Sequence, residues 1–357
     1  MHSSSESSRR RGALIVGAGA AGLLHGLSFR AHGVPVLAVY DPDRDKARRF
    51  AELVGGPRVL DDLDGVAQDS SIGCVSVCSP PRVHVEQAEQ CAGADRLLFV
   101  EKPVAMTREE MARLEKLPFA VPIVQWRAGR AIRTVRRAIA EGLLGPTPSV
   151  AIDLAWHRDA RYFAEGRDRY DLWGCGALLS VGIHALDAVC FALDRPIADV
   201  HGTLGYAAGI EVEIRAAANI AFRGGALASL RITFDAGMDQ TRLTFCGAGV
   251  TATIAGSEAD PTANPVEFIA ADPAKLQALR ALEGKVDGEG HSPLLVPFIG
   301  RAIESFRQGM LPGASSHFPS VRDVAIAHAA IFRVYEGETR TQRAIQPPST
   351  VSTCPLT

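Results

Sequence analysis

The sequence predicts an α/β protein with two domains: a doubly wound parallel sheet, followed by an α+β domain with an open, mostly antiparallel sheet. Three observations favour this fold class. From residue 13 to about 125, short apolar runs alternate with helical patterns, which is typical of parallel strands joined by helices. From about residue 148, strand-like runs follow one another closely and one helix interrupts them. The 357 residues, 47% of them hydrophobic, are enough to form two cores.

The first element is a buried strand, a glycine turn and a helix, in the sequence ALIVGAGAAG that begins at residue 13. This is the GxGxxG pattern of a Rossmann dinucleotide-binding domain. Gly17 allows the tight turn, Gly19 lets backbone N–H groups approach a pyrophosphate, and Gly22 lets the helix lie close to the strand. We expect Ala20 and Ala21, at the positive end of that helix, to line the phosphate site. The alternative is a glycine-rich turn in some other α/β protein.

The second apolar run, Val34 to Val39, leads into Asp41. An acid about 20 residues after the glycine motif is placed to hold a ribose hydroxyl of the cofactor. Because a carboxylate there repels a 2′-phosphate, the sequence predicts NAD, with NADP as the alternative. Arg44 and Lys46 lie just beyond and would weaken the preference for NAD.

The later strands of the parallel sheet are expected at residues 72–77, 97–100 and 121–124. The sequences CSPPRVH (from residue 78) and EKP (from residue 101) follow two of these strands. Ligands of such sheets bind at the carboxyl ends of the strands. The residues expected at the cofactor site there are Ser79, Pro80, His84, Glu101 and Lys102. Topology places Lys102 near the nicotinamide, and a lysine in a surface salt bridge is the alternative.

The second domain is expected to hold most of the remaining strands. These are predicted at residues 149–156, 200–206, 211–222, 226–234, 242–246 and 250–254, with helices at 177–192, 293–308 and 320–335. Residues 257 to 290, rich in Ala, Asp, Pro and Gly, are expected to form a loop or a partly ordered excursion. We place a flexible tail at residues 1–11, the dinucleotide-binding domain at 12–126, a substrate and oligomerisation domain at 127–345 and a loose tail at 346–357.

A third cluster lies in the second domain, in the sequence WGCGALLSVGIHALD from residue 173 to 187. Ser180, His184 and Asp187 are spaced to share one helical face. Taken by itself, His184 is either a functional group or a helical histidine whose polar atoms are satisfied in the domain interface.

Together these motifs resemble the Gfo/Idh/MocA oxidoreductases, the family of glucose-fructose oxidoreductase and inositol dehydrogenase. The sequences GAGAAG, SPPRVH, EKPVAMT, the arginine of QWR (residues 125–127) and GCGALLSVGIHALD follow the order and spacing of that family. The resemblance covers nearly the whole chain. It implies a Rossmann domain followed by an α+β domain with an open antiparallel sheet, and it makes Lys102 and His184 the counterparts of the catalytic lysine and histidine.

Those two roles are chemically reasonable. Oxidation of a secondary alcohol requires a group that removes the hydroxyl proton, and a histidine suits that task. A lysine ammonium beside the oxygen stabilises the developing alkoxide. One departure is Ser180, where the family usually has an acid. Either the chemistry depends more on Lys102, or groups of the substrate complete the site, or the reaction has changed or been lost. Cys175, where glycine is common, is interpreted as a packing residue.

The substrate is expected to contact the segment AWHRDARYF, residues 155–163, which resembles a pocket segment of family members that act on sugars or nucleotide sugars. Trp156 offers an apolar face for a sugar ring. Arg158, Arg161 and Tyr162 offer donors for hydroxyls, a carboxylate or a phosphate. These could equally be ordinary strand and loop residues. Arg127 is either a pocket residue or part of a salt bridge in the domain interface.

The function expected from these residues is an NAD(P)-dependent oxidoreductase. It would transfer a hydride between nicotinamide and a secondary hydroxyl or ketone of a sugar, aminosugar, nucleotide sugar or cyclitol, with a role in secondary metabolism as one setting. His184 would act as acid and base and Lys102 at the oxygen, with Ser180 and Asp187 orienting the site. The alternatives are a closed-cycle lyase or hydrolase that reuses its NAD, and a dinucleotide sensor without turnover.

Composition excludes several other classes. The net charge of −2 gives no reason to expect nucleic acid. No apolar stretch approaches the roughly 18 residues of a membrane span. The arginines of residues 9–11 precede the dinucleotide strand, so they are not interpreted as an export signal. Seven scattered cysteines without CxxC pairs predict a reduced cytoplasmic protein without a metal site. The open sheet predicts a homodimer or homotetramer.

Overall fold

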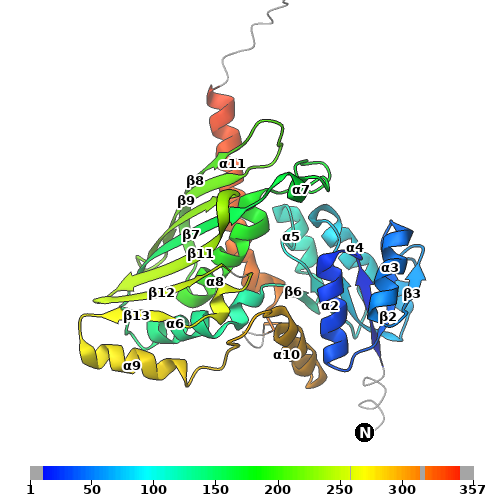
Figure 1. Ribbon diagram of the computed structural model, residues 1–357, viewed down its shortest axis with the longest axis horizontal. Coiled ribbons are helices and arrows are strands. Elements are labelled where there is room, and N and C mark those ends of the chain that lie inside the picture. The colour runs from blue at the N-terminus through cyan, green and yellow to red at the C-terminus, as the bar shows by residue number, and fades with distance from the viewer. Residues whose placement is uncertain (1–10, 258, 314–317, 346–357) are drawn as a thin grey trace, which may run out of the picture.

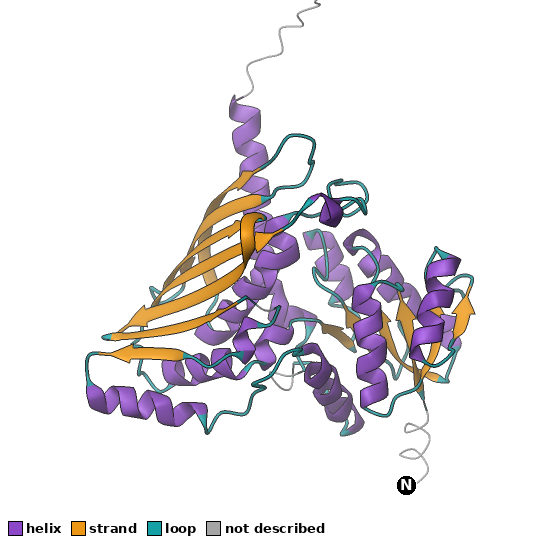
Figure 2. Cartoon of the chain, viewed as in Figure 1, coloured by secondary structure: helices purple, strands orange, loops and turns teal. Residues whose placement is uncertain are grey.

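The structure is a computed structural model that describes residues 11–257, 259–313 and 318–345 (Figure 1). Two sheets lie side by side, with helices between them and around them (Figure 2). The tails expected at residues 1–11 and 346–357 lie outside the described residues, apart from Arg11. Within the described part of the chain, no helix combines the length and apolar character needed to cross a membrane.

The first sheet is parallel throughout and has the order β3-β2-β1-β4-β5-β6. Its strands are β1 (Gly12–Val16), β2 (Val36–Tyr40), β3 (Arg58–Leu60), β4 (Ile72–Val77), β5 (Leu97–Val100) and β6 (Ala120–Pro122). The order reverses between β1 and β4, so the carboxyl ends of these two strands flank the crevice in which such sheets bind ligands. The doubly wound parallel sheet is confirmed, and β3 is a strand that we did not predict.

Helices cover this sheet and lead into the second one. They are α2 (Ala20–Ala31), α3 (Arg44–Val54), α4 (His84–Cys91) and α5 (Arg108–Leu114), with short 3₁₀ turns η1 (Val66–Gln68), η2 (Pro81–Val83) and η3 (Gln125–Ala128). The helix α10 (Leu295–Arg307), from far along the chain, lies beside α2 (Figure 1). Its Phe298 shares one buried core with Phe29 of α2. This helix, expected in the second domain, thus packs on the first one, and the domain boundary at residues 126 and 127 stays a prediction.

The second sheet is mixed and mostly antiparallel, as expected. Its order is β13-β12-β11-β7-β10-β9-β8. Among the described strands of this second sheet, β7 and β10 form the one parallel pair, and the other neighbours are antiparallel. The strands are β7 (Ser149–His157), β8 (Ile197–Gly205), β9 (Arg215–Phe222), β10 (Leu227–Thr233), β11 (Asp235–Gly247), β12 (Val250–Gly256) and β13 (Glu267–Ala270). Buried and exposed residues alternate along β9 and β10, so one face of the sheet is buried and the other is open.

The buried face packs against helices that lie between the two sheets (Figure 2). These are α6 (Arg130–Ala140), α8 (Ile183–Leu193) and α11 (Val321–Ile345). A π-helical turn, η4 (Leu178–Gly182), precedes α8, where we expected one continuous helix. A short helix, α7 (Ala160–Phe163), follows β7. All of α8 is buried, because it is covered by the second sheet, by α6 and by α11.

The expectation that residues 257 to 290 form a loop was wrong. This stretch contains η5 (Pro261–Ala263), β13 and α9 (Pro273–Glu283). Asp272 caps α9 by accepting a hydrogen bond from the N–H of Ala274, and Pro273 occupies the first helical position. The pair Asp272 and Pro273 is therefore a helix start. Phe268 of β13 joins the core of the second sheet, which explains why the chain folds back here.

Candidate active site

The glycine turn after β1 has the geometry that phosphate binding requires. Gly17 has φ +99°, and a Cβ at this position would lie 2.6 Å from the backbone N of Ser79. A Cβ at Gly22 would lie 2.0 Å from the carbonyl oxygen of Gly17. At Gly19, by contrast, the nearest atom is Nζ of Lys46, at 3.9 Å. The fold therefore needs Gly17 and Gly22, while Gly19 leaves free the space in which a pyrophosphate would approach the start of α2.

Asp41 is buried directly after β2 and is held in place by the backbone. Its Oδ2 accepts a hydrogen bond from the N–H of Ala18 at 2.8 Å, and its Oδ1 accepts one from the N–H of Asp43 at 3.0 Å. Lys46 lies 3.9 Å from Asp41, whereas Arg44 pairs with Asp61. The carboxylate thus stands beside the glycine turn, as expected for an acid that binds ribose. Lys46 is the cation placed to tolerate a 2′-phosphate.

Glu101, the residue before Lys102, belongs to a buried network that we did not predict. Its Oε1 lies 3.1 Å from Nε2 of His25, a residue of α2 that has no exposed surface. The other nitrogen of His25 lies 2.8 Å from Oγ of Ser76 in β4. Burial alone would raise the pKa of Glu101. The hydrogen bond to His25 and the charges of His25 and Lys102 outweigh it and bring the pKa to about 2.

Lys102 connects the two domains. Its backbone N–H donates to Glu101, and its Nζ donates to the carbonyl oxygen of Ser180 at 2.7 Å. Burial lowers the pKa of Lys102, and the negative charge of Glu101 works against that effect. The ammonium group is therefore fixed between the carboxyl end of β5 and the π-helical turn before α8. The structure brings Lys102, Ser180 and Glu101 together, as the motifs predicted.

His184 lies on α8 with 6% of its surface exposed. Its ring stacks on the indole of Trp126, with centroids 5.3 Å apart and planes 18° apart. Burial, and then the nearby charge of Lys102, lowers the pKa of His184 to about 3. Its Nδ1 is buried and has no hydrogen-bond partner among the described residues. The imidazole is therefore neutral at physiological pH and has a free nitrogen available for a proton.

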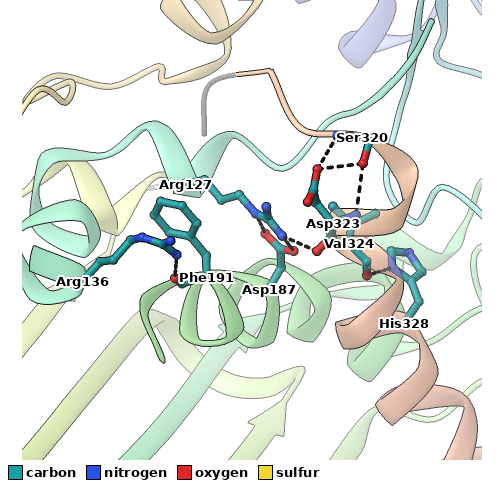
Figure 3. A network of polar contacts seen from close by, with 8 residues as sticks. All are labelled: Arg127, Arg136, Asp187, Phe191, Ser320, Asp323, Val324 and His328. Carbon is teal, nitrogen blue, oxygen red and sulfur yellow. Dashed lines mark hydrogen bonds and ion pairs between the residues drawn. The ribbon is translucent and has the colours of Figure 1, made fainter. Parts of the chain in front are cut away.

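The side chain of Ser180 does not orient His184. Its hydroxyl donates to the carbonyl oxygen of Gly176 at 2.6 Å, one turn back along the helix. Asp187 is also engaged elsewhere, because its two oxygens accept hydrogen bonds from Nε and Nη2 of Arg127, at 2.7 and 2.6 Å (Figure 3). We therefore correct the expected orienting role of Ser180 and Asp187.

Arg127 is a structural residue of the interface. Besides Asp187, it donates to the carbonyl oxygen of Asp323 at the start of α11 (Figure 3). Only 5% of the surface of Arg127 is exposed, and its guanidinium group bonds to other residues of the protein. Of the two interpretations of Arg127, the salt bridge is therefore the one found, and its assignment to substrate binding was wrong.

His84 also has a structural position. The residue is buried, and its two ring nitrogens lie 2.8 and 2.9 Å from the carbonyl oxygens of Ser79 and Pro103. It thereby connects the loops that follow β4 and β5, so its effect on a cofactor would be indirect. Ser79 donates through its hydroxyl to Gln87. Cys175 is buried, and burial raises the pKa of its thiol, which agrees with a packing role.

Glu213 is a buried carboxylate that the sequence did not reveal. It accepts the backbone N–H of Leu178 at 3.0 Å, at the start of the π-helical turn, and the hydroxyl of Tyr335 at 2.8 Å. A Cβ at Gly176 would lie 2.0 Å from the carbonyl oxygen of Glu213, so glycine is required there. A carboxylate at a helix start stabilises the free N–H groups. Glu213 therefore fixes the beginning of the segment that carries Ser180 and His184.

The predicted substrate segment lies next to Ser180. Burial raises the pKa of Tyr162 overall, although Ser180 is among the groups that lower that pKa. Trp156 donates to the hydroxyl of Thr241 at 3.1 Å, and the guanidinium of Arg158 lies 4.7 Å from the ring centroid of Trp156. Arg161 is exposed, so it is not part of this group. Two residues that we did not predict, Arg167 and Trp173, complete it. Arg167 lies 4.8 Å from the ring centroid of Tyr162 and 4.9 Å from that of Trp173.

Comparisons with known proteins agree with this geometry. A family model described as an oxidoreductase family with an NAD-binding Rossmann fold matches residues 11–118, and a model of the GFO/IDH/MocA C-terminal domain matches residues 132–259. The chain belongs to the Gfo/Idh/MocA family. The resemblance, the fold class and NAD as the cofactor of the first domain are confirmed. The alternative of NADP is not tested.

Curated relatives of this Gfo/Idh/MocA chain include sugar dehydrogenases. D-glucoside 3-dehydrogenase of Escherichia coli is 30% identical over 192 residues, which cover 51% of this chain and 54% of the relative. Levoglucosan dehydrogenase of Pseudarthrobacter phenanthrenivorans is 24% identical, and the match covers 65% of this chain and 69% of that protein. The chain thus spans about half the length of the first of these relatives.

Solved structures share the fold over almost the full length. The WlbA dehydrogenase of Bordetella pertussis, crystallised with NADH and UDP-GlcNAcA, superposes with a TM-score of 0.77 at 22% identity. The superposition covers 96% of this chain and 99% of that one. The arrangement of the two sheets is therefore also that of the WlbA dehydrogenase.

Proposed function

We propose that this protein is an NAD-dependent dehydrogenase or reductase that acts on a secondary hydroxyl or ketone of a sugar or cyclitol. One observation carries the proposal. A fixed lysine ammonium and a neutral histidine with an unpartnered nitrogen lie together at the carboxyl end of β5, in an NAD-binding family. The named relatives, which are dehydrogenases of glucosides and levoglucosan, support the same substrate class.

When bound, NAD would accept a hydride from the substrate carbon. In the direction of alcohol oxidation, the neutral imidazole of His184 would take the hydroxyl proton. The ammonium of Lys102 would hydrogen-bond the same oxygen and stabilise its developing negative charge. Glu101 keeps Lys102 in place through its backbone N–H and favours the charged ammonium. In the reverse direction, the same groups would return the proton to a ketone.

A direct test is NADH absorbance during incubation with NAD or NADP and a panel of sugars, aminosugars, nucleotide sugars and cyclitols. We expect NADH formation with at least one member of the panel. Lys102→Ala and His184→Ala should each lower kcat/KM by about 10²- to 10⁴-fold, the usual size of an acid–base contribution. Tight NADH binding without turnover across the panel would contradict the proposal and favour a closed cycle or a sensor.

We further propose that the protein works in the cytoplasm. The six cysteines of the described residues are all unpaired, and Cys74, Cys91, Cys175 and Cys190 are buried. Reduced core cysteines are typical of that compartment. Fractionation of cells of the source organism, with an antibody against the protein, tests this assignment.

A further inference from the structure

Two arginines and three aromatic rings are stacked on one another in and just beyond the predicted substrate segment. We call them the arginine stack: Trp156, Arg158, Tyr162, Arg167 and Trp173. Arg158 lies 4.7 and 5.1 Å from the ring centroids of Trp156 and Tyr162, and Arg167 lies 4.8 and 4.9 Å from those of Tyr162 and Trp173. Since stacking occupies the faces of the guanidinium groups, their in-plane N–H groups remain to bind acceptors.

Some of those donors lack acceptors. Nε of Arg158 and Nε1 of Trp173 are buried and have no hydrogen-bond partner among the described residues. Buried donors of this kind are costly unless an acceptor reaches them. The side chains of Arg158 and Arg167 remain 17% and 27% exposed, so both guanidinium groups are accessible from solvent. The arrangement therefore favours a ligand that supplies several acceptor oxygens.

The local charge also favours an anion. Both arginines act on Lys102, because the charge of each lowers its pKa. Lys102, Arg158 and Arg167 therefore contribute to one region of positive charge. Their acidic neighbours are at the edge of the site: Asp239 lies 3.3 Å from Arg158 and Glu165 lies 2.9 Å from Arg167, with 35% and 72% of the two acidic side chains exposed. The Arg167–Glu165 pair, whose acid is exposed, is of the weak kind, whereas Arg158 and Asp239 are half-buried and Nη1 of Arg158 also donates to the carbonyl oxygen of His157.

We propose that the substrate carries an anionic oxygen group, a carboxylate or a phosphate, which Arg158 and Arg167 bind while the sugar ring lies against the aromatic rings. This inference rests on the proposed function and narrows its substrate class. Planar guanidinium groups match the geometry of both carboxylates and phosphates, so the two arginines could bind either group in the same way. Tyr162 contacts both arginines and thereby holds the two guanidinium groups on one ring.

The sequence offers a readout that needs no turnover. The chain has three tryptophans. Trp156 and Trp173 belong to the arginine stack, and Trp126 stacks on His184. Intrinsic fluorescence therefore reports on this site alone. The probes are neutral hexoses, each paired with its uronic acid and with its 6-phosphate, titrated in the presence of NADH with excitation of tryptophan and correction for NADH absorbance.

We expect at least one anionic member to quench the fluorescence with about tenfold or greater preference over its neutral partner, the range of charged hydrogen bonds. Uronic acids and 6-phosphates in separate titrations distinguish a carboxylate from a phosphate. Arg158→Gln and Arg167→Gln should each weaken that preference. The preference of Arg167→Lys should be intermediate between that of Arg167→Gln and that of the wild type. Arg161→Gln, an exposed arginine of the same segment, is the matched control and should behave as wild type.

Equal quenching by neutral and anionic partners would overturn the inference, and so would the absence of a response to any anion at tens of millimolar. A preference that survives in the double variant Arg158→Gln, Arg167→Gln would also overturn it. Thermal unfolding of each variant shows whether it is folded. A preference for anions without NADH formation would contradict the proposed function and leave this inference intact.

Discussion

At the scale of single residues, burial sets the protonation states on which the site depends. His184 is neutral because the interior disfavours its charged form, and burial also lowers the pKa of Lys102, while the charge of Glu101 works against that effect. The hydroxyl proton of a substrate therefore has an acceptor and the oxygen has a cation. Both groups act from elements that packing holds rigidly.

The pH dependence of kcat/KM for alcohol oxidation tests the state of His184. A histidine with a pKa of about 3 stays neutral as the pH falls through 6.5, the ordinary value. We therefore expect no loss of kcat/KM from this group between pH 7 and pH 5. On the alkaline side, activity should decrease as the pH rises and Lys102 loses its proton. Because the pKa of Lys102 is lowered, this decrease should begin at a pH below its ordinary value of 10.5. A limb near pH 6.5 that disappears in His184→Ala would contradict this assignment.

Glu101 should contribute to stability in a pH-dependent way. Its folded-state pKa of about 2 lies below the ordinary 4.5, so its contribution is complete above pH 4.5 and is lost as the pH falls towards 2. The shift corresponds to about 3 kcal/mol. Urea unfolding of Glu101→Gln at pH 7 should show a loss of this order and a weaker pH dependence below pH 4.5. Unchanged stability would show that His25 does not hold the carboxylate.

At the scale of elements, local patterns were the predictable part of the fold and site. The glycine turn, the EKP sequence and the helix with His184 carry their signals within a few residues. His25, Glu213 and Arg167 act through partners distant in sequence, so no spacing rule could reveal them. The bond between Arg127 and Asp187 also joins residues 60 positions apart. Burial was the missing signal for His25, since a histidine on the inner face of α2 needs polar partners.

The start of α2 gives a matched pair of variants. Gly22→Ala would place a methyl group 2.0 Å from the carbonyl oxygen of Gly17, and should cost about 1–3 kcal/mol of stability. Gly19→Ala meets no atom closer than 3.9 Å, so it should fold normally. We expect it to weaken NADH binding because its methyl group enters the phosphate space. Thermal unfolding measures the stability of each variant, and NADH titration measures its affinity for the cofactor. Equal melting temperatures for the two variants would contradict the predicted difference in stability.

At the scale of the whole molecule, the buried pair Arg127 and Asp187 joins η3 and α8 to the start of α11 (Figure 3). Asp187→Asn leaves a buried guanidinium without its counter-charge, which typically costs about 3–5 kcal/mol. Asp171→Asn, which breaks an exposed pair with Arg169, should cost less than about 1 kcal/mol. Chemical unfolding compares the two variants. A similar small loss in both would show that the interface does not depend on this pair.

The open face of the second sheet supports the prediction of a homo-oligomer. Leu227 and Ile269, on strands β10 and β13, are 57% and 62% exposed. Light scattering during gel filtration should give the mass of a dimer or tetramer. Leu227→Glu should shift the protein towards the monomer by burying a charge in the interface. A wild-type monomer at micromolar concentration would contradict this prediction.

The proposed reaction at this site is the transfer of a hydride between the substrate carbon and nicotinamide. The most direct measurement uses the active member of the substrate panel, deuterated at the reacting carbon, and mass spectrometry of the NADH formed. We predict NADH heavier by one deuterium with the wild type, and its formation about 10²- to 10⁴-fold slower with Lys102→Ala at the same cofactor occupancy. NADH without deuterium, or a Lys102→Ala variant as active as the wild type, would contradict the account.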